Sequence, residues 1–191
     1  MARTLEPTAK RFTRREYYRL DDSGVFEDQR VELIDGEIIS IPPIGNPHFV
    51  ALGLGETLFR NAFGPDYWVR SQGPLSVQPA SEPQPDLAIV KGKPRDFTDH
   101  PGNALLVVEI SESTLMHDQT VKMSLYARNE VQDYWIVNLL DHCLEVYRQP
   151  VADKSRRFGF RYASVTTLQP RERIAPLALP RKKILVADLL P

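Results

Sequence analysis

The sequence predicts an α/β protein with a mixed central sheet flanked by helices. Three observations support this fold class: a β-hairpin signal near the start of the chain, a strongly apolar segment in its middle, and strand-like segments interspersed with two helical patterns. The apolar segment "ALLVVEI" (104–110) has consecutive apolar residues without polar alternation. A strand of this kind is covered on both faces, so the segment is expected near the centre of the sheet.

The hairpin and the first helix follow from local signals. In "RVELIDGEIIS" (30–40), two β-rich arms flank Asp35 and Gly36. This dipeptide favours a type I′ turn, in which both central residues need positive φ. The next segment, "NPHFVALGLGETLFRNAF" (46–63), has apolar residues at helical intervals and Pro47 at a position suited to a first helical turn.

Two short strands are predicted next, in "YWVRSQ" (67–72) and "PDLAIV" (85–90). The proline-rich connection "QPASEPQ" (78–84) joins them and cannot continue a ladder, because proline lacks the backbone donor. A polar loop (92–103) then leads into the central strand.

The second half of the chain also contains both a helical pattern and strand-like segments. "HDQTVKMSLYARN" (117–129) predicts a helix with Asp118 as its N-cap, and "DYWIVN" and "CLEVYRQ" predict two strands joined by a turn. "FGFRYASV" (158–165) is expected to add a strand and "KILVADLLP" (183–191) a packing tail, with irregular chain between them because of prolines.

Composition limits the class of protein. The 191 residues fit a single domain, 1–191, and 42% hydrophobic with 26% charged residues is typical of a globular chain. The single cysteine, Cys143, excludes an internal disulfide and suits a buried thiol in a reducing cytoplasm. No apolar run approaches the ~20 residues that span a bilayer, so neither export nor membrane insertion is expected.

The charge balance argues against a uniformly basic nucleic-acid-binding coat. The net charge is −1, so a polyanion such as a nucleic acid would have to bind at a local cluster of basic residues. Two basic clusters occur, and solvent-exposed surface is the favoured interpretation of both. Their residues are Lys10, Arg11, Arg14, Arg15, Arg181, Lys182 and Lys183.

Two carboxylates stand at the ends of predicted buried strands. Glu109 shares a strand face with Leu105 and Val107, and Asp86 begins the preceding strand. A buried carboxylate is costly unless a cation, a metal or a proton compensates it. If the strands are neighbours, oxygen ligands of this kind favour a hard ion such as Mg²⁺ or Mn²⁺. Spacing alone leaves a purely structural role equally open.

Lys122 lies near the start of the second predicted helix, where the helix dipole disfavours a cation. One explanation is that it positions an attacking water or counters charge on a phosphate. The other is an ion pair with Asp118 at i, i+4, worth ~0.2–0.5 kcal/mol. From spacing alone, this ion pair is the preferred explanation.

Competing motifs are missing from the sequence. There is neither a G-x-x-x-x-G-K-[ST] phosphate loop nor a G-x-S-x-G nucleophile motif. The four histidines show no paired metal spacing, so zinc is not expected. They are His48, His100, His117 and His142.

A set of motifs in fixed order resembles a known family. "VELIDGEI", the following "PH", "QPDLAIV", "LLVVEIS", the D and K of "HDQTVK" and "YARNEVQDYWIVN" are similar to the Uma-type "putative restriction endonuclease" family of the PD-(D/E)XK nuclease superfamily. The resemblance covers 31–147. It implies a restriction-endonuclease-like fold, with the hairpin and the C-terminal strands as additions.

The resemblance also implies a site. Asp86 and Glu109 become the metal-binding carboxylates for Mg²⁺ or Mn²⁺, and the backbone carbonyl of Ile110 completes the metal site. The superfamily commonly has lysine two residues after the glutamate, where this chain has Ser111. The family form supplies the lysine from the next helix, which assigns the catalytic role to Lys122.

Three further residues match family-like positions. Glu32 is a candidate ligand for a second metal, and the alternative is a solvent-facing hairpin residue. His48 and Tyr126 are candidate auxiliary residues, and packing is the alternative for both.

The chain departs from the family pattern at three loop positions. These departures are expected to change turns and substrate access rather than ligands. They are Glu112 in place of proline, Glu130 in place of glycine and Asn138 in place of aspartate.

The resulting expectation is a cytoplasmic, Mg²⁺-dependent endonuclease that hydrolyses phosphodiester bonds in DNA, without a small-molecule cofactor. A homodimer would suit cleavage of both strands. The alternative from another class is a catalytically silent module that keeps the fold and binds nucleic acid or protein. A glycosidase using the same two carboxylates is a further enzyme alternative, and its activity would survive a chelator.

Overall fold

The computed structural model describes residues 8–78 and 80–191 of the chain. The predicted domain start, 1–7, and Pro79 of the proline-rich connection lie outside the described residues. Backbone contacts divide the chain into two compact units. The first contains the N-terminal part up to Pro43 together with Val77–Pro83, and the second contains Ile44–Ser76 and Gln84–Pro191.

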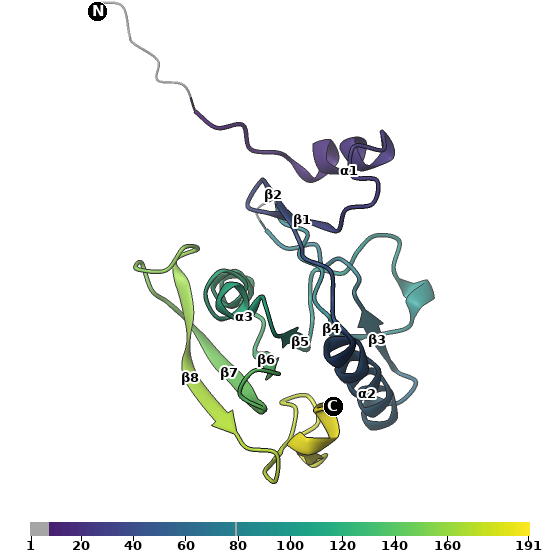
Figure 1. The fold of residues 1–191 in the computed structure, drawn as a ribbon, viewed down its shortest axis with the longest axis vertical. Helices are drawn as coiled ribbons and strands as arrows, with labels where there is room; N and C mark the ends of the chain where they lie inside the picture. The colour runs from purple at the N-terminus through teal and green to yellow at the C-terminus, as the bar shows by residue number, and fades with distance from the viewer. Residues whose placement is uncertain (1–7, 79) are drawn as a thin grey trace, which may run out of the picture. The chain divides into compact units, whose positions relative to one another are not determined.

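The first unit contains the predicted hairpin. Strands β1 (Val31–Ile34) and β2 (Glu37–Ser40) are antiparallel, and φ is 50° at Asp35 and 78° at Gly36 (Figure 1). Both values lie in the left-handed region that a type I′ turn requires, so the hairpin prediction is confirmed.

The first unit also contains a helix that the sequence interpretation missed. Helix α1 (Arg14–Asp22) begins after Thr13, whose side chain accepts from the Glu16 backbone N–H while the Glu16 carboxylate accepts from the Thr13 backbone. This reciprocal capping box was readable as T-x-x-E in the sequence. Arg14 and the Tyr18 hydroxyl both bind the buried Glu82 carboxylate.

The second unit is built on a mixed sheet that has six strands within the described residues, in the order β3-β4-β5-β6-β7-β8. The strands are β3 (Tyr67–Ser71), β4 (Leu87–Lys91), β5 (Leu106–Ser111), β6 (Asp133–Asn138), β7 (Cys143–Ala152) and β8 (Phe160–Leu168). Strands β5 and β6 are parallel and the other neighbours are antiparallel. The mixed sheet and the interior position of β5 confirm the predicted fold class.

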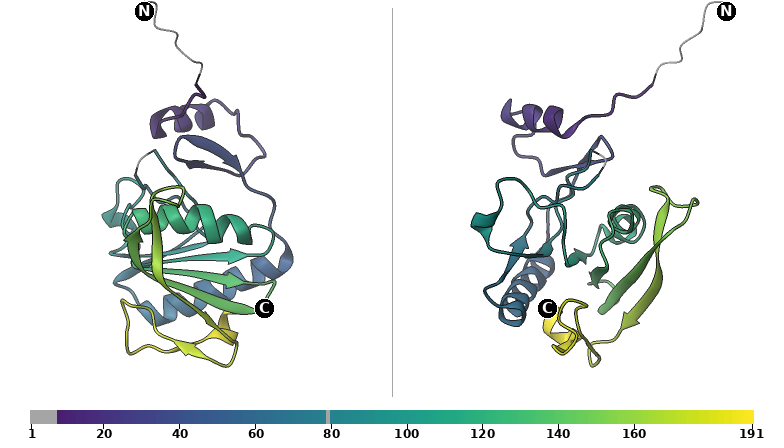
Figure 2. Two further views of the ribbon diagram at one scale, coloured as in Figure 1. Left: turned by 90° about the vertical axis from the view of Figure 1, so that its left-hand side faces the viewer. Right: turned by 180° about the vertical axis from the view of Figure 1, so that it is seen from behind.

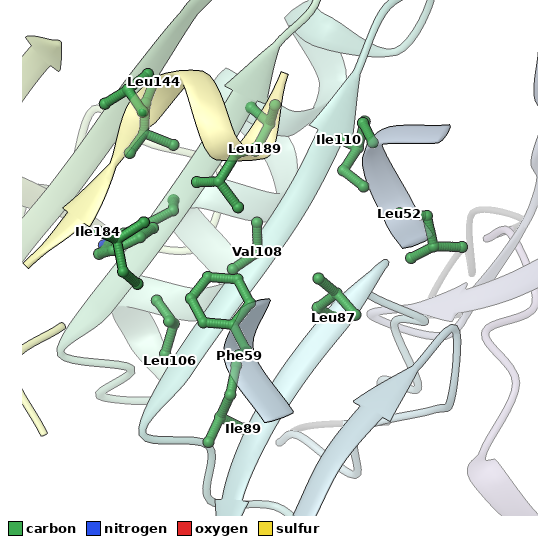
Figure 3. Packing of buried hydrophobic residues seen from close by; sticks show 14 of the residues in the cluster. Leu52, Phe59, Leu87, Ile89, Leu106, Val108, Ile110, Leu144, Ile184 and Leu189 are labelled. Atoms are coloured by element: carbon green, nitrogen blue, oxygen red, sulfur yellow. The ribbon is translucent and has the colours of Figure 1, made fainter. Parts of the chain in front are cut away.

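One face of the sheet packs against α2 (Asn46–Phe63), which confirms the first predicted helix. Every second residue of β5 joins this apolar core, together with Phe59 of α2 and Leu189 near the C-terminus (Figure 3). These β5 residues are Leu106, Val108 and Ile110. The intervening β5 residues, Val107, Glu109 and Ser111, are buried too and face the opposite side, so both faces of the strand are covered.

The opposite face is covered by a second helix, which consists of α3 (Leu115–His117), the π-helical segment η2 (Asp118–Lys122) and α4 (Met123–Arg128). Figures 1 and 2 show it lying across the sheet on the side away from α2. The prediction that Asp118 caps its N-terminus is wrong. The helix begins four residues earlier, after Thr114, and the Asp118 carboxylate instead accepts from the Ser111 and Thr114 hydroxyls.

The C-terminal stretch is more regular than its prolines suggested. The predicted strand extends to the nine residues of β8, and two short strands, β9 (Arg173–Ile174) and β10 (Ile184–Leu185), pair with each other. A 3₁₀ turn, η3 (Val186–Leu189), then packs into the core, which confirms the packing tail. Among the described helices, none combines the length and apolar character that crossing a membrane requires.

Candidate active site

The candidate site lies where the ladder between β4 and β5 ends. The last backbone pair is Leu87 with Val108. Beyond it, the Oδ2 of Asp86 accepts from the Ile110 N–H at 2.8 Å, and the Oε2 of Glu109 accepts from the Asp86 N–H at 3.3 Å. Side-chain oxygens therefore replace the carbonyl partners that a continuing ladder would supply. The two predicted carboxylates meet at this point.

Asp86 is held from two further elements. The Nε2 of His48, in the first turn of α2, lies 2.8 Å from Asp86 Oδ1, and the Gln72 side-chain amide donates to the same oxygen at 3.3 Å. Burial raises the pKa of Asp86, but the hydrogen bond and charge of His48, the Ile110 N–H and the charge of Lys122 outweigh it. The pKa lies below its ordinary value, so Asp86 is ionised at neutral pH.

Glu109 is bound by the helix on its face of the sheet. Its Oε1 accepts from Lys122 Nζ at 3.0 Å and from the Tyr126 hydroxyl at 2.8 Å. Glu109, Lys122 and Tyr126 are all buried. Lys122 and Tyr126 are four residues apart, which places both side chains on the same face of the helix.

The backbone carbonyl of Ile110 faces the same side as Asp86. The Ser111 carbonyl accepts from Leu139 at the end of β6, so Ser111 bonds toward β6. Successive strand residues direct their backbone groups to alternate sides, and the N–H and C=O of one residue point the same way. The Ile110 carbonyl therefore points with its own N–H toward Asp86.

This donor set suits a hard divalent cation. Two buried carboxylates and a carbonyl supply oxygen ligands, and Mg²⁺ commonly takes only one or two protein carboxylates while keeping several waters. Within the described residues, no group of three or more His, Cys, Asp or Glu side chains forms a metal cage. Lys122 contacts Glu109 and His48 contacts Asp86, and a divalent ion between the two carboxylates would further offset their mutual repulsion.

Asp118 and Ser111 form a contact next to this site. Asp118 Oδ2 accepts from the Ser111 hydroxyl at 2.7 Å and from the Thr114 hydroxyl at 2.8 Å. Burial raises the pKa of Asp118, although Lys122 and the two hydroxyls act in the opposite direction. Lys122 acts on Asp118 electrostatically, but the contact partners are others: the Ser111 and Thr114 hydroxyls for the Asp118 carboxylate, and Glu109 Oε1 for Lys122 Nζ.

Sequence reasoning missed Gln72 and the π-helical segment. Gln72 has φ 50°, and its backbone N–H donates to the Asp86 carbonyl at 3.0 Å, so a turn of left-handed conformation brings its amide to the site. A glutamine in this conformation carries no sequence signal comparable to Asn-Gly or Asp-Gly. The bulge in the helix likewise has no marker in its apolar pattern.

Glu32 lies on β1, in the first unit, and its exposed fraction is 2%. The expectation of a solvent-facing hairpin residue is therefore wrong, because Glu32 is buried. Its role toward a second metal stays a prediction.

The mixed sheet flanked by helices, with two carboxylates at the end of an antiparallel ladder and a lysine from the following helix, agrees with the restriction-endonuclease-like fold that the resemblance implied. A solved structure has this fold: the "putative nuclease belonging to DUF820" from Anabaena variabilis. It is 12% identical to this chain with a TM-score of 0.67, and the match covers 93% of this chain and 97% of that one. At this identity, the likeness shows a shared fold.

The family model described as "Putative restriction endonuclease", Uma2, matches residues 14–186. The chain belongs to this family, as the resemblance predicted. The comparison with curated proteins found no match.

Proposed function

We propose that this protein is an endonuclease that hydrolyses phosphodiester bonds in DNA with the help of Mg²⁺ or Mn²⁺. The observation that carries the proposal is the meeting of Asp86 and Glu109 at the end of one ladder, with Lys122 Nζ 3.0 Å from Glu109. Membership of a family described as restriction endonucleases supports the same reaction class.

In this proposal, Asp86, Glu109 and the Ile110 carbonyl hold the metal ion. When bound, such an ion acts as a Lewis acid on a phosphoryl oxygen and lowers the pKa of a water molecule. His48 and Gln72 fix the orientation of the Asp86 carboxylate through their contacts with its Oδ1.

Lys122 positions the nucleophilic water or stabilises the negative charge that develops on the phosphate. A buried ammonium held in a fixed geometry meets this charge without reorganising, which is the usual source of electrostatic catalysis. Tyr126 shares Glu109 Oε1 with Lys122 and so orients the carboxylate from the helix side.

Further details of the proposal follow from the chemistry of the site and the chain. The substrate is DNA, a homodimer would cut both strands, and no small-molecule cofactor is required. The single thiol, Cys143, is free and buried, which suits a reducing cytoplasm. Residues 1–191 are proposed to act as one domain with the motif-bearing core 31–147.

Cleavage of supercoiled plasmid DNA with added Mg²⁺ tests the proposal. The wild type should cleave, EDTA should abolish cleavage, and Asp86→Ala should lose it while its circular dichroism spectrum and unfolding transition remain those of a folded protein. Calorimetry with Mn²⁺ should give a binding heat that Asp86→Ala and Glu109→Ala remove.

Three outcomes would contradict the proposal. Undiminished cleavage by folded Asp86→Ala would exclude the assigned site. Glycoside hydrolysis that survives EDTA would favour the glycosidase alternative. A wild type with neither cleavage nor a Mn²⁺ binding heat would favour the catalytically silent module.

A further inference from the structure

The segment that carries Lys122 is a π-turn inside an otherwise α-helical stretch. Within η2 the Met123 N–H donates to the Asp118 carbonyl, a bond across five residues, whereas an α-helix spans four. A π-turn accommodates one extra residue and rotates the following helix relative to the preceding one. Such turns are uncommon and need support from their surroundings.

The support at the start of this turn comes from Asp118. Asp118 is 2% exposed, and its carboxylate accepts from the hydroxyl of Ser111, at the end of β5, and from that of Thr114, just before the helix. Its backbone carbonyl also accepts from the Tyr134 hydroxyl of β6 at 3.1 Å. Side chain and backbone of one residue are therefore tied to the sheet that carries Glu109.

The next residue is tied to a different strand. The Gln119 amide donates to both oxygens of Glu145 on β7, at 2.9 and 3.0 Å. Consecutive residues of the π-turn are thus fixed to β5 and β7. Because the turn is held at its start, the residue at its end, Lys122, has a defined direction toward Glu109 Oε1.

We propose that Asp118 is a positioning residue that acts through Lys122: the Ser111 and Thr114 hydroxyls hold its carboxylate, and the π-turn anchored there presents the ammonium to Glu109. This inference rests on the proposed function of Lys122. It also gives a role to Ser111, the residue that occupies the usual lysine position of the superfamily. The serine does not replace the lysine but holds the turn that supplies it.

The precision required explains why such an anchor matters. Lys122 and Tyr126 both reach a single carboxylate oxygen, at 3.0 and 2.8 Å. A displacement of about 1 Å at a catalytic group can cost on the order of 100-fold in rate. Without the anchor, relaxation of the π-turn toward an α-helix would rotate Lys122 away from this oxygen.

The experiment compares two substitutions of Asp118 in Mg²⁺-dependent DNA cleavage. Asp118→Ala removes the acceptor of both hydroxyls, and we expect kcat to fall about 10- to 100-fold with little change in KM. Asp118→Asn keeps a carbonyl oxygen that can accept both hydroxyls, and it should restore most of kcat.

The matched control is Ser124→Ala, on the next turn of the same helix. Ser124 is fully buried, and its hydroxyl donates to the Phe160 carbonyl of β8 at 2.8 Å. Its replacement also removes a buried tie between helix and sheet, but one that does not hold the π-turn. We expect lower stability with kcat within about twofold of the wild type, because the partners of Ser124, the Phe160 carbonyl and the Phe158 N–H, belong neither to the π-turn nor to the candidate site.

A double-mutant cycle shows whether Asp118 acts through the lysine. In a Lys122→Met background, Asp118→Ala should change kcat by less than about twofold, because its effect has already been removed. Equal losses in both backgrounds would overturn the proposal. So would an Asp118→Asn variant as slow as Asp118→Ala, or an effect confined to KM.

A structural measurement keeps this inference separate from the proposed function. Crystal structures of Asp118→Ala and Ser124→Ala should differ in one contact, with Lys122 Nζ out of hydrogen-bond reach of Glu109 only in the first. Retention of that contact in Asp118→Ala would overturn the positioning role even for an active enzyme. If the wild type does not cleave DNA, the proposed function fails while this measurement still decides the role of Asp118.

Discussion

Two buried glutamates, Glu109 and Glu145, lie on the same face of the central sheet and have different surroundings. Both are paired in register with Ile136 of the strand between them, and both contact the helix that covers this face. Glu145 accepts hydrogen bonds on both oxygens from uncharged donors. These donors are Gln119, Asn138 and the Tyr147 hydroxyl.

Glu109 differs in its charged neighbours. Its carboxylate accepts hydrogen bonds from the Lys122 ammonium and from the backbone N–H of Asp86. Asp86 is also the residue that carries the second carboxylate of the site. Burial and hydrogen bonding are common to both glutamates, so these features alone do not mark a functional residue. What distinguishes the candidate site is a second carboxylate at an interrupted ladder, with a lysine and a histidine as side-chain partners.

The largest expected difference is in DNA cleavage by the two glutamine variants. Glu109→Gln should lower kcat by on the order of 1,000-fold, since it removes a proposed ligand of the metal ion, whose contribution would amount to several kcal/mol. Glu145→Gln should stay within about threefold of the wild type, because its remaining carbonyl oxygen still accepts some of these hydrogen bonds and β7 lies two strands from β5, which carries Glu109. Plasmid cleavage under matched Mg²⁺ concentrations measures both.

Equal losses in the two variants would erase the distinction between the glutamates. The two buried glutamates would then share one structural role, and the assignment of Glu109 as a metal ligand would lose its support.

A smaller effect is expected on stability. Glu145→Ala leaves the donors of three neighbouring side chains without their acceptor, and each buried unsatisfied group costs about 1–3 kcal/mol, part of which water and rearrangement recover. We expect the free energy of unfolding to fall by about 3 kcal/mol, measured by urea denaturation. A loss below about 0.5 kcal/mol, the range of ordinary surface substitutions, would show that Glu145 is not a structural anchor.

The smallest effect concerns pH and compares Asp86 with Asp118. Burial raises the pKa of both, but His48 and the other partners of Asp86 bring its pKa below the ordinary value of 3.8, whereas the pKa of Asp118 stays above it. Ionised Asp86 therefore stabilises the fold above pH 3.8, and this contribution is lost as pH falls through its lower folded pKa. Protonated Asp118 stabilises the fold below pH 3.8, and this contribution is lost as pH rises through its higher folded pKa.

Urea unfolding from about pH 2 to pH 7, without metal, measures these contributions. Asp86→Asn should flatten the acid side of the stability profile, and Asp118→Asn should flatten the decline toward neutral pH. Identical profiles for the two variants would contradict the opposite directions of the two pKa shifts.

Much of the fold follows from local signals. Asp35 and Gly36 specify the hairpin, the apolar run before Glu109 specifies a doubly covered strand, and the pattern around Phe59 specifies a helix. These signals are local because turn conformation and burial periodicity act over a few residues. Helix α1 was missed although its capping box, from Thr13 to Glu16, is also local.

The sequence predicted which residues form the candidate site better than it predicted the contacts between them. Asp86, Glu109 and Lys122 were singled out by position and resemblance, and His48 and Tyr126 proved to contact the two carboxylates. The role of Ser111, the π-turn and the contribution of Gln72 were not predictable, because each depends on which segments the fold brings together.

By itself, the sequence determined the fold class, the central strand and the identity of the chemical groups near the strand ends, since these depend on composition and spacing. Only the tertiary structure decided that Asp86 binds the Ile110 N–H, that the Asp118 carboxylate binds the Ser111 hydroxyl and does not cap its helix, and that Lys122 contacts Glu109. The physical reason is that hydrogen bonds between distant segments require a particular strand register and helix rotation, and neither is encoded within any one segment.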